Sequence, residues 1–203
     1  MIGVIDYGMG NLHSVEKALH HLGAPCRRID QADACGDLRA LVLPGVGAFD
    51  PAIERLRAAG WEVPLRRWHA EGRPLLGICL GLQLLFEGSD EGQAAGLGLL
   101  PGRVEALPPE PQEPRPHMGW APLLPASATP LLDPGAPAPW VYFVHSFAAV
   151  PRDGACVTAR VGYGATTAVA AVGCGALQAV QFHPEKSGRA GLQLLQRWLA
   201  SLP

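Results

Sequence analysis

Residues 73–86 have the sequence Arg73-Pro-Leu-Leu-Gly-Ile-Cys-Leu-Gly-Leu-Gln-Leu-Leu-Phe86, and this stretch carries the strongest fold signal in the chain. The apolar run 75–78 predicts a buried strand, and the helical spacing of Leu82, Leu85 and Phe86 predicts a helix over 80–86. The Gly-x-Cys-x-Gly segment between them is typical of a sharp turn that holds a nucleophile at a sheet edge. The helix N-terminus would favour the thiolate of Cys79. A buried structural cysteine is the alternative.

A second motif lies near the other end of the chain, in Gln178-Ala-Val-Gln-Phe-His-Pro-Glu185. In an extended backbone, His183 and Glu185 leave on the same side because they are two residues apart, and Pro184 favours an extended His183. A cysteine, an imidazole that takes its proton and a carboxylate that orients the imidazole form a catalytic triad by role. A surface turn without chemistry is the alternative.

A third motif, Pro44-Gly-Val-Gly47, follows a strand expected over 41–43. Open α/β sheets bind ligands beyond the carboxyl ends of their strands. The glycines that flank Val46 let its peptide rotate at little steric cost, so that an N–H can turn towards a ligand oxygen. An ordinary glycine-rich loop is the alternative.

The remaining segments predict an ordered series of strands and helices. We expect further strands over 1–6, 26–29, 140–147, 156–161, 166–172 and 176–182. We expect further helices over 14–22, 49–59, 61–71 and 191–202, with Leu192, Leu195 and Leu199 buried in the last of these. The proline-rich segments 108–116 and 121–139 are predicted to be surface connections, with a loop at Pro116-His-Met-Gly-Trp120 between them.

Composition restricts the class of protein. A length of 203 residues with 48% hydrophobic content predicts a single domain, 1–203, with a substantial core. The net charge of −2 gives no reason to expect a nucleic acid or an anionic membrane as partner. No apolar run approaches the roughly 20 residues that span a bilayer, and the N-terminus lacks a signal-like segment. The 5 cysteines include no Cys-x-x-Cys pair, which argues against a zinc cluster and for a reducing cytoplasm.

The first two motifs together resemble the class I, triad-type glutamine amidotransferases, and the resemblance covers nearly the whole chain. It implies a doubly wound α/β fold of flavodoxin-like type, with a mostly parallel central sheet and helices on both faces. It also implies that Cys79 attacks the side-chain amide of glutamine, that His183 acts as general base and then acid, and that Glu185 orients the imidazole. No cofactor or metal is required, because thiolate attack on an amide needs neither.

The same resemblance implies roles for the groups around this triad. The oxyanion hole would be formed by the N–H groups of Val46 and Leu80, beside Gly47. The residues implied to hold glutamine are Gly45, Gln83, Ser146 and Phe147. Phe147 stands where the family frequently has tyrosine, so no hydroxyl role is expected there.

Three segments are similar to the glutaminase subunits of imidazole glycerol phosphate synthases: Asp6-Tyr-Gly-Met-Gly-Asn-Leu12, Pro44-Gly-Val-Gly47 and Pro116-His-Met-Gly-Trp120. This similarity implies a heterodimer with a (β/α)8-barrel cyclase, which uses the ammonia in histidine biosynthesis and activates the glutaminase on docking. The interface residues implied are Asn11, Trp120, Tyr142 and Lys186. The alternatives are a glutaminase of another pathway, such as pyridoxal phosphate synthesis, and an amidotransferase-like domain kept for structure or regulation.

Overall fold

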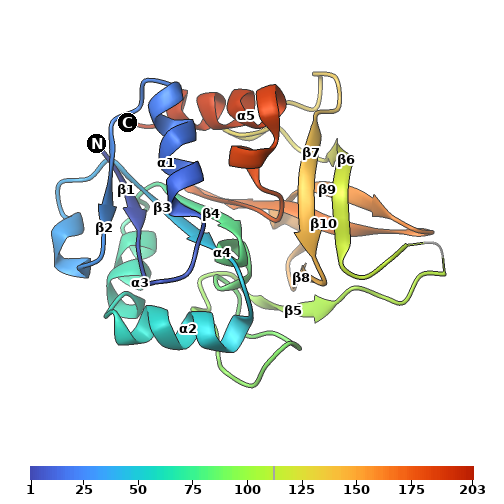
Figure 1. Cartoon of the computed structure of the whole chain (residues 1–203), viewed down its shortest axis with the longest axis horizontal. Helices are drawn as coiled ribbons and strands as arrows, with labels where there is room; N and C mark the ends of the chain where they lie inside the picture. Colours follow the sequence, from blue (N-terminus) through green and yellow to red (C-terminus); the bar gives the residue numbers. More distant parts are fainter. Residues whose placement is uncertain (112) are drawn as a thin grey trace.

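The computed structural model describes residues 1–111 and 113–203, and Figure 1 shows a central sheet with helices on both sides. The strands are β1 (Ile2–Ile5), β2 (Cys26–Ile29), β3 (Ala40–Gly45), β4 (Leu75–Cys79), β5 (Gly102–Ala106), β6 (His117–Pro125), β7 (Trp140–His145), β8 (Phe147–Pro151), β9 (Val157–Tyr163), β10 (Thr166–Cys174) and β11 (Leu177–Val180). The α-helices are α1 (Leu12–His21), α2 (Phe49–Ala58), α3 (Glu62–Ala70), α4 (Leu80–Gln83) and α5 (Gly188–Ala200). Short 3₁₀ helices are η1 (Ala32–Cys35), η2 (Gly154–Cys156) and η3 (Pro184–Lys186). Within the described residues, no helix is both long enough and apolar enough to cross a membrane.

The main sheet has the strand order β2-β1-β3-β4-β11-β10-β9-β6-β7. Neighbouring strands are parallel from β2 to β11 and antiparallel from β11 to β7. The expected doubly wound α/β fold is confirmed, with a mixed sheet whose parallel part contains β2, β1, β3, β4 and β11. The carboxyl ends of these parallel strands lie at one edge, so the segments that follow them meet where open α/β sheets bind ligands.

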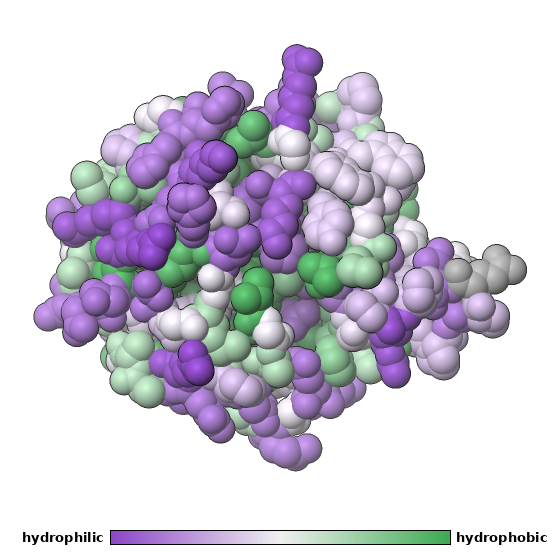
Figure 2. Space-filling view, in the orientation of Figure 1, coloured by the Kyte–Doolittle hydropathy of each residue, from purple (hydrophilic) through white to green (hydrophobic). Residues whose placement is uncertain are grey.

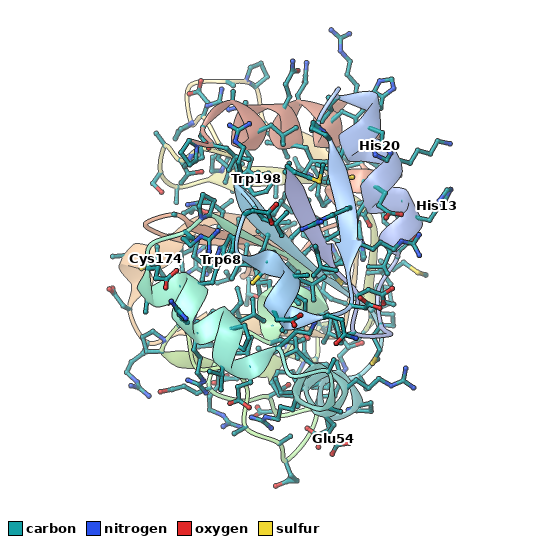
Figure 3. The ribbon with its side chains drawn as sticks, turned by 90° about the vertical axis from the view of Figure 1, so that its left-hand side faces the viewer. His13, His20, Glu54, Trp68, Cys174 and Trp198 are labelled. Carbon is teal, nitrogen blue, oxygen red and sulfur yellow. The ribbon has the colours of Figure 1, made fainter. Side chains whose placement is uncertain are left out.

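Two hydrophobic cores lie on opposite faces of the sheet. One core contains Val15 and Leu19 of α1 together with Trp198 of α5. The other contains Ile53 of α2 and Trp68 of α3. Figures 1 and 3 show the two helix pairs on opposite sides of the strands, with Trp68 and Trp198 labelled. Burial from both sides explains the unbroken apolar runs of β1 and β4, which are typical of central parallel strands.

The antiparallel part of the structure differs from the sequence expectation in two places. Residues 117–125 form strand β6, where we expected a loop and the start of a surface connection. The strand expected over 140–147 is divided at Ser146 into β7 and β8, and β8 pairs with β5 in a separate small sheet. Because β6 pairs with both β7 and β9, long-range pairing determines a conformation that its proline-containing sequence does not predict.

Two helices also differ from their predicted extent. α4 ends at Gln83 and not at residue 86, because the N–H groups of Leu85 and Phe86 donate to the carbonyl groups three residues back, those of Leu82 and Gln83, and not to those four residues back. α5 begins before the predicted residue 191 and buries Leu194, Leu195 and Trp198. Leu192 and Leu199 flank that face and are only partly buried. The buried face of α5 is therefore rotated slightly about the helix axis from the face that the leucine spacing predicts.

Candidate active site

Cys79 lies at the end of β4, where the chain turns into α4. Its backbone has a φ of +55°, a left-handed conformation that residues other than glycine rarely adopt. The glycines of the motif allow this turn: a Cβ on Gly81 would clash with the carbonyl oxygen of Leu43, and one on Gly77 would lie 3.0 Å from the Cβ of Ala179. The strand–turn–helix geometry is therefore present. Because α4 is a single turn, however, the helix dipole next to Cys79 is smaller than the predicted longer helix would provide.

His183 follows β11, the strand next to β4 in the sheet. Its Nδ1 atom lies 2.7 Å from Oε1 of Glu185, and the exposed fractions of the two side chains are only 2% and 1%. The predicted extended conformation is correct for His183 but wrong for Glu185, because Pro184–Lys186 forms the 3₁₀ helix η3. The tight turn nevertheless brings the carboxylate onto the imidazole.

The charge state of His183 follows from its two neighbours. Its Nδ1–H donates to the carboxylate of Glu185, and its Nε2 is buried without a well-formed hydrogen bond to any described residue. Burial lowers the pKa of His183, but the interactions with Cys79 and with Glu185 outweigh burial and raise this pKa to about 9. The imidazole is therefore protonated at neutral pH, which is the state that pairs with a thiolate.

A pocket of about 340 Å³ opens beside these residues, within the size range of small-molecule sites. The predicted site residues that line it are Val46, Gly47, Cys79, Leu80, Gln83, Ser146, Phe147 and His183. Gly45 is buried in the sheet opposite Cys79 and is not among the described lining residues, nor is Glu185, which contacts His183. Within residues 1–111 and 113–203, no group of three or more His, Cys, Asp or Glu side chains is placed to hold a metal ion.

The segment after β3 runs along this pocket. Gly45 is the register neighbour of Cys79, so Val46 continues past the nucleophile and is 38% exposed. Gly47 has a φ of +102°, a conformation that favours glycine. A Cβ at Gly47 would also lie 2.8 Å from the Cε atom of Met9. A glycine at position 47 is therefore needed for the main chain to take this course.

Glu91 is a pocket residue that the sequence did not single out. Its Oε2 accepts a hydrogen bond of 2.9 Å from the N–H of Phe49, at the start of α2. The loop that carries Glu91 is held by Asp50, whose carboxylate accepts hydrogen bonds from the N–H groups of Gln93 and Ala94. No local sequence pattern distinguishes Glu91 from other acidic residues in polar loops. These long-range hydrogen bonds place it at the site.

His145 is a second pocket residue for which no role was expected from the sequence. Its Nδ1 lies 2.9 Å from the carbonyl oxygen of Phe147, and its Nε2 lies 3.1 Å from Nδ1 of His117. A carbonyl only accepts, so Nδ1 of His145 carries the hydrogen, and its Nε2 accepts from His117. Burial lowers the pKa of His145 to about 4 and also lowers the pKa of His117. Both rings are therefore neutral at pH 7, and they hold β6, β7 and the Phe147 carbonyl in place.

The four predicted interface residues lie on neighbouring elements. Trp120 of β6 and Tyr142 of β7 are register partners with ring centroids 6.2 Å apart. Trp120 is 52% exposed, and Lys186 of η3 is exposed as well. Asn11 immediately precedes α1, which packs against η3. The structure thus brings these residues into one region next to the pocket.

Comparisons with known proteins agree with this geometry. The family model "Glutamine amidotransferase class-I" matches residues 3–201. The imidazole glycerol phosphate synthase subunit HisH of Synechococcus sp. (strain CC9605) is 57% identical over 201 residues, which cover 99% of this chain and 94% of that protein. The HisH subunit of Prochlorococcus marinus (strain MIT 9312) is 47% identical over 204 residues, covering 99% and 98%. A crystal structure of a glutamine amidotransferase shares the fold, with a TM-score of 0.75, 24% identity and coverage of 98% and 97%.

Proposed function

We propose that this chain hydrolyses glutamine to supply ammonia for histidine biosynthesis. It belongs to the class-I glutamine amidotransferases and, within them, to the HisH subunits of imidazole glycerol phosphate synthase. The observation that carries the catalytic assignment is the buried contact of 2.7 Å between His183 and Glu185, beside a cysteine with a left-handed backbone. All five cysteines are free, which fits the reducing cytoplasm that we propose as its location.

At neutral pH the proton of the Cys79 thiol already lies on Nε2 of His183, and Glu185 orients the ring. The thiolate attacks the side-chain amide carbon of glutamine, and the N–H groups of Val46 and Leu80 stabilise the oxyanion. His183 then gives its proton to the departing ammonia, which leaves a thioester on Cys79. A water molecule deprotonated by His183 hydrolyses the thioester, so that glutamate leaves and the thiol is restored.

The polar groups of the pocket fit the other end of glutamine. Glu91 offers a carboxylate to the α-ammonium group, and Ser146 offers a hydroxyl to the α-carboxylate. The NH2 group of Gln83 already donates to Phe147 and Gln181. Its carbonyl oxygen is therefore the part of Gln83 that serves the ligand, as a second acceptor for the ammonium group.

The ammonia leaves for a partner subunit, and we place the docking surface on the outer face of β6 and β7. Exposed apolar side chains at Met118, Trp120, Leu124 and Trp140 gather there, and Figure 2 shows this part of the surface as mainly pale, not strongly hydrophilic. Such patches on soluble proteins mark interaction sites. With Asn11, Tyr142 and Lys186 they form a surface for a cyclase subunit, for which we propose a (β/α)8 barrel in a heterodimer.

A glutaminase assay, run with and without this cyclase, tests the proposal. Cys79→Ala should abolish glutamate release in both conditions, whereas Cys174→Ala, which changes an exposed cysteine of β10, should leave it unchanged. A glutamine-like electrophile should label Cys79 alone among the five cysteines. Labelling spread over the other four would refute the nucleophile, and activity in the isolated chain equal to that of the complex would refute activation by docking.

A further inference from the structure

Gln181 contacts the reactive sulfur, although the mechanism above gives it no role. It directly follows β11 and is fully buried. Its Oε1 atom lies 3.1 Å from Nε2 of Gln83, and its Nε2 atom lies 3.8 Å from Sγ of Cys79, to which it donates. Gln181 therefore links the pocket residue Gln83 to the proposed nucleophile.

Neighbouring groups determine which way the Gln181 amide faces. The carbonyl oxygen of Phe147 can only accept, so the Gln83 atom 3.1 Å away from it must be the nitrogen of the NH2 group. The same NH2 group donates to Gln181, which must present its oxygen there and its NH2 group to Cys79. The Phe147 carbonyl also accepts from His145. The Phe147 carbonyl, which accepts hydrogen bonds from Gln83 and His145, therefore determines that the NH2 group of Gln181 faces the sulfur.

We propose that Gln181 is a catalytic residue that donates a hydrogen bond to the Cys79 thiolate and thereby stabilises it and directs the sulfur into the pocket. This inference rests on the proposed function, in which Cys79 is the nucleophile. A neutral thiol is a weak acceptor and a thiolate a strong one, so this hydrogen bond favours the state in which Cys79 is a thiolate and its proton lies on His183.

Other titratable groups also act on this sulfur, and they remain unchanged in the variants proposed below. Cys79 acts electrostatically on Tyr7, after β1, and on His183, after β11, and raises the pKa of both groups. Glu91 and His145 face the same pocket. A difference in the pH dependence of Cys79 between variants of Gln181 therefore reports the amide.

The test measures how fast iodoacetamide alkylates Cys79 in the full chain as a function of pH, by mass spectrometry of the peptide that contains Cys79. Gln181→Met removes the donor in a side chain of similar size, and Gln181→Glu places an oxygen where the NH2 group stood. Gln178→Met is the matched control, because Gln178 is also buried, lies in β11 and bonds to Gly175 away from the pocket. At neutral pH we expect about tenfold slower alkylation or more in Gln181→Met, the factor for a lost hydrogen bond to a charged group. Gln181→Glu should be slower still, and the control should match the wild type.

The possible outcomes separate this inference from the proposed function. If Cys79 is no more reactive than the other cysteines in the wild type, the proposed function fails. If Cys79 is reactive and both Gln181 variants follow the wild-type pH profile, only the role of Gln181 is overturned. Should a variant not fold, the wild-type chain labelled with ¹⁵N in its glutamine side chains gives the answer. The NH2 signal of Gln181 should shift over the pH range in which alkylation increases, and a constant signal overturns the inference.

Discussion

At the scale of the single residue, Tyr7 stands out because its hydroxyl is buried without a hydrogen bond to any described residue. The hydroxyl lies against the segment that follows β3: a Cβ on Gly45 would be 2.6 Å from it. Burial, and then the nearby Cys79, raise the pKa of Tyr7, so the group stays a neutral phenol. A buried polar group without a partner destabilises the folded state by about 1–3 kcal/mol. In this protein the group lies next to the segment that forms the proposed oxyanion hole.

Tyr7→Phe should therefore leave the free energy of unfolding unchanged or increase it by up to about 2 kcal/mol, because it removes an unsatisfied hydroxyl and keeps the ring. Urea unfolding measured by circular dichroism gives this quantity. Tyr163→Phe is a parallel case, since the Tyr163 hydroxyl is also buried without a partner among the described residues. A loss of more than about 1 kcal/mol in Tyr7→Phe would mean that the hydroxyl has a hydrogen-bond partner after all.

At the scale of elements, Ser187 ties β7 to the turn that carries His183 and Glu185. The N–H of Tyr142 donates to Oγ of Ser187 at 2.9 Å, and this Oγ donates to the carbonyl of His183 at 2.6 Å. The N–H of His183 in turn donates to the carbonyl of Tyr142 at 3.0 Å. One face of β7 carries part of the proposed docking surface, so the same strand joins that surface to the turn that holds His183.

Ser187→Ala breaks two of these hydrogen bonds, and the free energy of unfolding should fall by about 1–3 kcal/mol. We also expect a lower kcat of the glutaminase with little change in KM, because His183 is displaced while the glutamine pocket is preserved. The matched control is Ser201→Ala, whose Oγ donates one hydrogen bond to Trp198 at the end of α5. If both serine variants lose stability equally and keep full activity, Ser187 does not position His183.

The same elements show where prediction from the sequence succeeds. The Gly-x-Cys-x-Gly turn is a local pattern that the structure contains. His183 and Glu185 are in contact as expected, although Glu185 reaches the imidazole through η3 and not through an extended backbone. Glu91 and Gln181 are held at the site by hydrogen bonds to residues far away in the sequence. No local sequence pattern therefore predicts that they belong to the site. The strand β6 likewise depends on pairing with distant strands, which overrides local preference.

At the scale of the whole molecule, two buried histidines make stability depend on pH in opposite directions. His145 has its pKa lowered by burial from an ordinary 6.5 to about 4, and His183 has its pKa raised to about 9 by Cys79 and Glu185 against the effect of burial. Between pH 4 and 6.5 the unfolded chain binds more protons at His145 than the folded chain does, so the contribution of His145 to stability increases with pH. Between pH 6.5 and 9 the folded chain binds more protons at His183, so the contribution of this residue to stability decreases with pH. We also predict that residues 1–203 form one domain, and a single cooperative unfolding transition would support this.

The contributions of these two histidines to stability are therefore jointly greatest near pH 6.5. His145→Gln should flatten the acid side of the stability profile, which in the wild type loses on the order of 3 kcal/mol as the pH falls through the pKa of His145. His183→Gln should flatten the alkaline side and leave the acid side as it is. Urea unfolding at a series of pH values measures both, with His13→Gln as the control because His13 is exposed on α1 and lies on the outer face of the helix in Figure 3. An acid limb in His145→Gln as steep as in the wild type would show that His145 is not neutral in the folded protein, and the hydrogen-bond directions assigned to His117, His145 and Phe147 would then be wrong.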